Sequence, residues 1–286
     1  MQIVQGADAP APNHSKEVTM SLFRDKAPKV EIAPTQTKLP FGSGVKKKPE
    51  PNPTNWQFAK LKACKAMTQE KLPTQASIKA KFGPVYSQIY GSCTSNAVLA
   101  CDAYYYHTEK WSPSAVFTYY NQHVLEKDTS GEDNGSTVEM GLDAVRKYGA
   151  CNAKVWPNTK PYNKKPSKKA YKNGLKGHEL TNYYNVKSLL QIKKAICKGY
   201  PVAFAADWAF TSVDPKTWIL NDPTDKEIEN CTAGHAMVIV GYDDTTELFE
   251  IRNSWGTGWA NKGYAYISYS TLKKVIWFDD TYAVVK

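Results

Sequence analysis

Three stretches of the chain contain residue types that can act together on an acyl group. The first spans residues 88–94 and contains Cys93, the second contains His235, and the third begins at Asn253. A thiolate is a nucleophile, an imidazole can pair with it and later protonate a leaving amine, and an amide side chain can fix the imidazole tautomer. Cys, His and Asn in this chain order therefore predict nucleophilic acyl transfer.

The residues around Cys93 favour a reactive thiol. Cys93 follows Gly91 and Ser92 and opens a predicted helix over residues 93–107, in which small and apolar residues recur at helical spacing. Backbone N–H groups and the positive end of the helix dipole favour the thiolate at such a position. A cysteine without these neighbours is more often a core residue, and Cys101 is interpreted in that way.

Helices and strands are expected to hold these residues in two separate lobes. Capping signals predict helices that begin at Ser112-Pro113, at Ser136 with Glu139 three residues later, and at Ser188 with Gln191 three residues later. The last third of the chain is rich in β-branched and aromatic residues and predicts strands over residues 202–205, 236–242, 248–253 and 263–269. Helices followed by strands predict an α+β fold with two lobes.

Two longer strings connect this chemistry to a family. They are Gly-His-Ala-Met-Val-Ile-Val-Gly-Tyr at residues 234–242 and Asn-Ser-Trp-Gly-Thr-Gly-Trp at residues 253–259. The histidine and asparagine of papain-like enzymes lie about 130–150 residues after the cysteine. His235 lies 142 residues after Cys93, inside this range, and Asn253 lies 160 residues after it, just outside. From about residue 72 onward the chain resembles the papain-like cysteine peptidases. The string Gly-Ser-Cys-Thr-Ser-Asn-Ala resembles cathepsin-like members from bacteria and large DNA viruses.

The resemblance implies a role for each catalytic residue. Cys93 would be the nucleophile on a helical lobe, with His235 as general acid/base and Asn253 as its orienting residue on a β-barrel-like lobe. Trp255 would cover the hydrogen bond between histidine and asparagine. Gln88 would donate to the oxyanion together with the backbone N–H of Cys93, as preorganised donors do in acyl transfer.

The resemblance also implies how a polypeptide substrate is held. Gly135 and Ser136 align with the residues that keep the substrate backbone extended. Val138, Ala205 and Gly234 would line a roomy hydrophobic pocket. An endopeptidase is expected, because no paired-histidine insertion of the kind that gives dipeptidase activity follows Cys93.

The chain also departs from the family pattern. Tyr90 stands where many papain-like enzymes have a half-cystine, and residues 133–135 offer no cysteine as its partner. Four residues separate Gln88 from Cys93 where five are usual, and Thr94 replaces the usual aromatic residue. These departures leave a second interpretation open, namely a catalytically impaired papain fold that binds peptides or a partner.

The first 70 residues differ from the rest, and residues 71–286 are expected to form the peptidase domain. Residues 1–56 are rich in proline and lysine and predict an extended arm with little core, while residues 57–70 predict one short helix. The arm would either block the cleft of a precursor until it is cut or act as a plain linker.

Composition limits the remaining possibilities. The 286 residues carry 37 basic and 27 acidic side chains, a net charge of +10. This charge permits nucleic acid as a partner, but no basic stripe with interleaved aromatic residues supports it. No apolar run reaches the roughly 20 residues of a membrane span, and the six cysteines lack zinc-ligand spacing. We therefore expect no metal and no cofactor. We also expect a monomer. No secretory signal is visible, which favours a reducing compartment or a virus particle.

Overall fold

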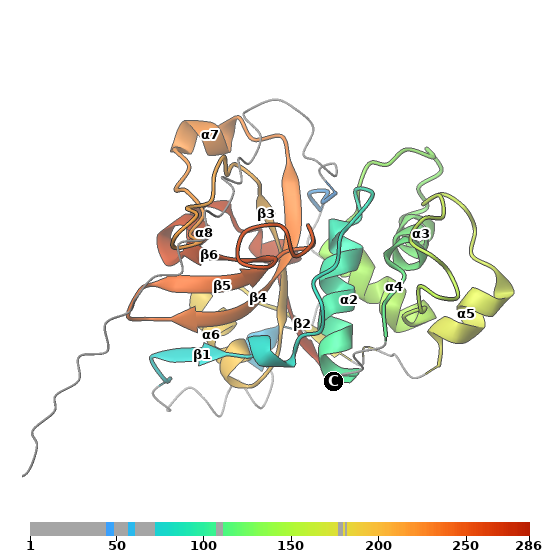
Figure 1. The fold of residues 1–286 in the computed structure, drawn as a ribbon, viewed down its shortest axis with the longest axis horizontal. Helices are drawn as coiled ribbons and strands as arrows, with labels where there is room; N and C mark the ends of the chain where they lie inside the picture. The colour runs from blue at the N-terminus through green and yellow to red at the C-terminus, as the bar shows by residue number, and fades with distance from the viewer. Residues whose placement is uncertain (1–43, 49–56, 61–71, 107–110, 177–179, 181) are drawn as a thin grey trace, which may run out of the picture.

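The computed structural model describes residues 44–48, 57–60, 72–106, 111–176, 180 and 182–286. Helices α2 to α5 lie on one side of the molecule and the sheet lies on the other, as Figure 1 shows. This arrangement confirms the predicted α+β fold with two lobes. The α-helices are α2 (Cys93–Tyr106), α3 (Ala115–Glu126), α4 (Val138–Tyr148), α5 (Lys168–Gly174), α6 (Leu189–Cys197), α7 (Asp225–Glu229) and α8 (Tyr269–Val275).

Strands within the described residues form a single antiparallel sheet. They are β1 (Gln75–Ser77), β2 (Asn182–Asn185), β3 (Val202–Asp207), β4 (Gly234–Asp243), β5 (Leu248–Arg252), β6 (Tyr264–Ser268) and β7 (Tyr282–Val285). The order is β2-β7-β3-β4-β5-β6, and β1 pairs with the far end of β4. Short 3-10 turns lie at η1 (Phe58–Lys60), η2 (Lys79–Lys81) and η3 (Phe278–Asp280). The four strands predicted in the last third of the chain correspond to β3, β4, β5 and β6.

Helix α2 is the element that joins the two lobes. Its residues are buried almost all the way round, as expected for a helix in the centre of a core rather than at its surface. It packs against β4 on one side and against α3 and α4 on the other. The first residue of α2 therefore lies at the junction between the lobes, and that residue is Cys93.

Two of the three predicted helix starts were wrong by one or two residues. Helix α3 is capped by Ser114, whose side chain accepts a hydrogen bond from the backbone of Phe117. Helix α4 is capped by Thr137 and not by a capping box starting at Ser136, because the Ser136 hydroxyl donates to Glu126 instead. The cap of α6 at Ser188 is as predicted.

Within the predicted helix over residues 57–70, Phe58–Lys60 form the 3-10 turn η1, and residues 61–70 lie outside the described part of the chain. In the described ranges no helix combines the length and the apolar character that a membrane crossing requires.

Candidate active site

The ends of three elements bring the predicted catalytic residues to the junction of the lobes. Cys93 begins α2, His235 is the second residue of β4, and Asn253 directly follows β5. The backbone of Ala236, the residue after His235, lies within hydrogen-bonding reach of the Cys93 thiol. Residues separated by more than a hundred positions in the sequence thus meet at one place.

His235 and Asn253 are joined by a buried hydrogen bond. The Nε2 atom of the imidazole lies 2.7 Å from the Oδ1 atom of Asn253. The same oxygen accepts the backbone N–H of Ser254 at 2.7 Å, which holds the amide in place. The Nδ1 atom of His235 has no hydrogen-bond partner among the described residues. Nδ1 is therefore the nitrogen that remains available to a thiol or a leaving group.

Two indole rings shield this hydrogen bond from water. The Trp255 ring lies 4.7 Å from the His235 ring, at an angle of 33° between the two planes. Trp208 meets His235 edge-on at 5.1 Å between ring centres and also contacts Trp255 at 4.9 Å. No pattern in the sequence indicated Trp208 as part of the site. Only the register of β3 against β4, with Ala206 opposite His235, places that indole beside the imidazole.

Burial controls the protonation of both reactive groups. It raises the pKa of the Cys93 thiol to about 12 and lowers the pKa of His235 to about 4. Both groups are consequently neutral at pH 7 in this structure. Burial thus opposes the thiolate that the helix start favours, because the surroundings of the thiol exclude water and penalise its charge.

The amide of Gln88 is tied into the loop that precedes α2. Its Nε2 atom donates to the carbonyl of Tyr90 at 3.2 Å, and its Oε1 atom accepts from the Ser254 hydroxyl at 2.5 Å. The backbone N–H of Gln88 donates to the Ser254 carbonyl at 2.8 Å. The residue lies buried close to the site, and its role as an oxyanion donor stays a prediction.

A carboxylate links the two loops in which the disulfide of many papain-like enzymes is missing. Both oxygens of Asp133 accept the backbone N–H of Gly91 at 3.0 Å. The Tyr119 hydroxyl donates to the Asp133 Oδ1 atom at 2.7 Å and accepts the N–H of Gly135 at 2.9 Å. Hydrogen bonds thus join the nucleophile loop to the Gly135 loop without a covalent bond.

Part of the N-terminal arm, residues 44–48, lies between the two lobes directly over Cys93 (Figure 1). A Cβ atom on Gly44 would lie 2.8 Å from the Cys93 sulfur and would overlap the carbonyl of Gly91. Val45 pairs with Ser136 in parallel register, because the Ser136 N–H donates to the Gly44 carbonyl at 2.9 Å and the Lys46 N–H donates to the Ser136 carbonyl at 2.8 Å. We call residues 44–48 the cleft segment. Within this segment, Val45 is buried against the lobes.

The residues predicted to bind substrate lie around the cleft segment. A Cβ on Gly135 would lie 2.5 Å from the Gly44 backbone, and a Cβ on Gly234 would overlap the Val45 side chain. Val138 and Ala205 are fully buried nearby: Val138 begins α4, and the carbonyl of Ala205 accepts the N–H of Trp277 at 2.8 Å. Trp277, which no sequence pattern indicated, lies against the same face of Gly234 as Val45.

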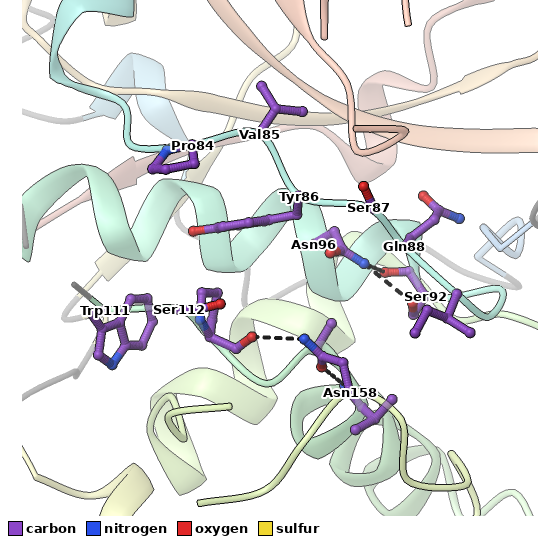
Figure 2. A pocket seen from close by; sticks show the side chains of 14 residues that line it. Pro84, Val85, Tyr86, Ser87, Gln88, Ser92, Asn96, Trp111, Ser112 and Asn158 are labelled. Carbon is purple, nitrogen blue, oxygen red and sulfur yellow. Dashed lines mark hydrogen bonds between the residues drawn. The ribbon is translucent and has the colours of Figure 1, made fainter. Parts of the chain in front are cut away.

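A separate hollow of about 280 Å³ lies behind the nucleophile loop. Figure 2 shows Tyr86, Ser92 and Asn96 on one side of it and Trp111 and Asn158 on the other. None of the cleft-segment residues lines this hollow. It is therefore distinct from the groove that contains the cleft segment.

Comparison with known proteins agrees with this geometry. The sequence profile of the Peptidase_C39 like family matches residues 69–280, which is most of the chain. The chain therefore belongs to this family. The predicted resemblance to papain-like cysteine peptidases of the cathepsin-like type is confirmed.

Individual relatives support the same assignment. The uncharacterized peptidase C1-like protein L477 of Acanthamoeba polyphaga mimivirus is 31% identical over 196 residues, which cover 63% of this chain and 62% of that protein. The chain thus spans less than two thirds of this relative. Xylellain, a cysteine protease from Xylella fastidiosa, has 26% identity and a TM-score of 0.71, covering 86% of this chain and 97% of its own.

A more distant solved structure shows the fold alone. The Carica candamarcensis cysteine protease CMS1MS2, solved in complex with E-64, has 20% identity and a TM-score of 0.56. The match covers 75% of this chain and 99% of that protein. The two-lobed papain-like architecture is therefore the frame in which the site lies.

Proposed function

We propose that this chain is a cysteine endopeptidase that hydrolyses polypeptides through Cys93, His235 and Asn253. The observation that carries the proposal is the buried hydrogen bond between His235 and Asn253, which leaves Nδ1 of the imidazole without a hydrogen-bond partner among the described residues. The Cys93 sulfur attacks the peptide carbonyl and its proton passes to His235. His235 then protonates the leaving amine, and water releases the acyl group from Cys93.

Covalent labelling tests this proposal. An epoxide inhibitor of papain-like enzymes is incubated with the reduced protein, and the modified residue is located by mass spectrometry. Labelling of Cys93 with loss of peptide hydrolysis is expected, and Cys93→Ala abolishes both. Cys231→Ala is the matched control, because Cys231 is a half-buried free thiol outside the site. Labelling spread evenly over the cysteines, or hydrolysis that survives Cys93→Ala, contradicts the proposal.

We further propose that the protein is made as an autoinhibited precursor whose residues 1–70 form the inhibitory part and residues 71–286 the peptidase domain. Support comes from the cleft segment, which covers the thiol and forms two backbone hydrogen bonds with Ser136. The segment also lies over the Cys93 sulfur, where burial disfavours the thiolate needed for attack. The segment would inhibit both by occupying the groove and by keeping the thiol neutral.

A substitution at Gly44 tests the inhibitory role. Gly44→Ala places a methyl group against the backbone of Gly91 and the Cys93 sulfur. Overpacking of this kind costs about 1–3 kcal/mol, which corresponds to a rise in peptide hydrolysis of roughly fivefold to a hundredfold in intact chains. Gly83→Ala is the control, because nothing lies within 4 Å of its added Cβ. Equal initial rates for Gly44→Ala and the wild-type chain would favour the linker interpretation.

One observation favours the impaired-enzyme alternative. The Gln88 side-chain N–H donates to the carbonyl of Tyr90 within its own loop. If that amide is not available to an oxyanion, Gln88→Ala changes turnover little. A loss on the order of a hundredfold is expected for a working donor.

A further inference from the structure

Two carboxylates on the helical lobe face the third residue of the cleft segment. The ammonium group of Lys46 lies 3.3 Å from the Oε2 atom of Glu126 and 3.1 Å from the Oδ2 atom of Asp128. Both acidic side chains are largely buried, with 15% and 13% of their surfaces exposed. A primary ammonium ion is thus bound at this place by groups that belong to the folded lobe.

The helical lobe itself holds the two carboxylates in position. The Ser136 hydroxyl donates to Glu126 Oε1 at 2.5 Å. Asp128 accepts the Ser130 N–H at 2.9 Å and the Asn134 side-chain N–H at 3.0 Å. Neither arrangement depends on Lys46, so the geometry persists when the arm leaves.

The charge of this site persists as well. Hydrogen bonds from Ser130 and Asn134, together with Lys46, hold the pKa of Asp128 well below its usual range. The nearest imidazole, His123, has its Nδ1 atom 3.6 Å from Asp128. Burial lowers the pKa of His123, so this side chain is neutral at pH 7 and does not compensate the carboxylates. An anionic site remains that will attract another cation.

The path of the cleft segment places the site relative to the nucleophile. Gly44 lies at the Cys93 sulfur, Val45 enters the pocket at Gly234, and Lys46 reaches the carboxylates. Side chains of an extended chain alternate in direction. The cleft segment leads away from the thiol in the N-to-C direction and pairs with Ser136 in parallel register, whereas the acyl side of a substrate leads away from the scissile bond in the C-to-N direction. A substrate that lies along the same edge with the opposite chain polarity therefore presents its first residue to the thiol, its second to the pocket and its third to the acidic pair.

We infer that Glu126 and Asp128 form a binding site for a basic substrate side chain, at the third residue on the acyl side of the scissile bond. The substrates are then polypeptides with lysine or arginine at that position, and Lys46 occupies the site in the precursor. This inference rests on the proposed peptidase function and adds a substrate class to it.

Competing fluorogenic peptides test the inference on the full-length protein. In all three peptides the reporter amide is attached to the first residue on the acyl side, and valine is the second residue, counted toward the N-terminus. The peptides differ only at the third residue, which is lysine, its uncharged analogue norleucine, or glutamate. The readout is the ratio of kcat/KM values within one preparation. This ratio does not depend on the fraction of molecules in which the arm has left the cleft.

A preference for lysine over norleucine of roughly tenfold is expected, with glutamate the poorest of the three. The preference falls as salt approaches about 1 M, where charges are screened within about 3 Å. Equal rates for lysine and norleucine overturn the inference while leaving the peptidase proposal intact. Failure to cleave any peptide, together with no labelling of Cys93 by the epoxide, overturns both.

Substitutions then locate the site. The double variant Glu126→Gln with Asp128→Asn brings the ratio of lysine to norleucine close to one. Glu132→Gln is the matched control, because Glu132 is an exposed carboxylate of the same loop that makes no ion pair with Lys46. A lysine preference that survives the double variant places the basic side chain elsewhere and contradicts the inference. The wild-type ratio remains decisive if the double variant fails to fold.

Discussion

At the scale of single residues, the protonation of Cys93 and His235 depends on what covers them. The helix start and the nearby imidazole favour a thiolate, yet burial raises the pKa of the Cys93 thiol to about 12. Burial likewise lowers the pKa of His235 to about 4. Water exclusion therefore outweighs the helix dipole in the covered site, since transferring a charge into a dry environment costs several kcal/mol.

The pH dependence of alkylation checks this balance. In the intact chain the rate of Cys93 alkylation should rise about tenfold per pH unit up to pH about 10, because the thiolate fraction grows below a pKa of about 12. In Gly44→Ala the thiol regains water and its imidazole partner, so the rate should level off near or below neutral pH. A plateau at neutral pH in the intact wild-type chain would contradict the neutral thiol.

At the scale of elements, the loop before α2 and the loop before α4 both lie against the cleft segment and are connected to each other by hydrogen bonds. Papain-like enzymes with the usual cysteines have a disulfide there, whereas here Asp133 accepts Gly91 and Tyr119 donates to Asp133. Tyr119 in turn accepts the N–H of Gly135, which directly precedes Ser136, the residue that pairs with the cleft segment. Hydrogen bonds, which require no oxidation, thus hold the two loops in place relative to each other.

Asp133→Ala tests the connection. Loss of these hydrogen bonds should lower the free energy of unfolding by only about 1 kcal/mol, because Asp133 is exposed to solvent. Peptide hydrolysis should fall more, by roughly tenfold in kcat, since the loop before Cys93 loses its register. Glu132→Ala is the control, an exposed neighbour without contact to Gly91. A change in stability with kcat unaltered would show that the carboxylate serves the fold alone.

At the scale of the whole molecule, the cleft segment is anchored by a buried ion pair at its far end. Lys48 pairs with Glu139 of α4, and the two side chains are only 5% and 3% exposed. The Lys48 ammonium also donates to the hydroxyl of Tyr282 at 2.9 Å. Asp280 lies near the pair and accepts the N–H groups of Val138 and Glu139; burial raises its pKa to about 7.

Lys48→Met should release the segment, because it leaves Glu139 as a buried charge without its lysine. Breaking such a pair costs about 3–5 kcal/mol. The melting temperature should fall, and epoxide labelling of Cys93 in the intact chain should accelerate. Lys47→Met provides the matched control, since Lys47 is 73% exposed and lies 3.8 Å from Asp207. If both variants behave alike, Lys48 is not the anchor.

The monomeric state, the lack of a nucleic-acid partner and the cellular compartment stay predictions.

The papain-like fold and family could be predicted from the sequence because the motifs around Cys93, His235 and Asn253 are contiguous stretches of residues, which can be recognised without a structure. Helix starts were misjudged at Ser112 and Ser136 because several hydroxyl residues lay near each start and only the backbone geometry selects the cap.

The sequence by itself determined the residue types of the site, the two-lobed α+β class and the existence of a distinct N-terminal arm. Only the tertiary structure decided that Trp208 shields His235, that Asp133 connects the loops, and that Lys46 and Lys48 bind acidic groups some 80 or more positions away. The reason is physical: these contacts arise from strand register and lobe packing, which bring distant segments together and leave no periodic trace along the chain.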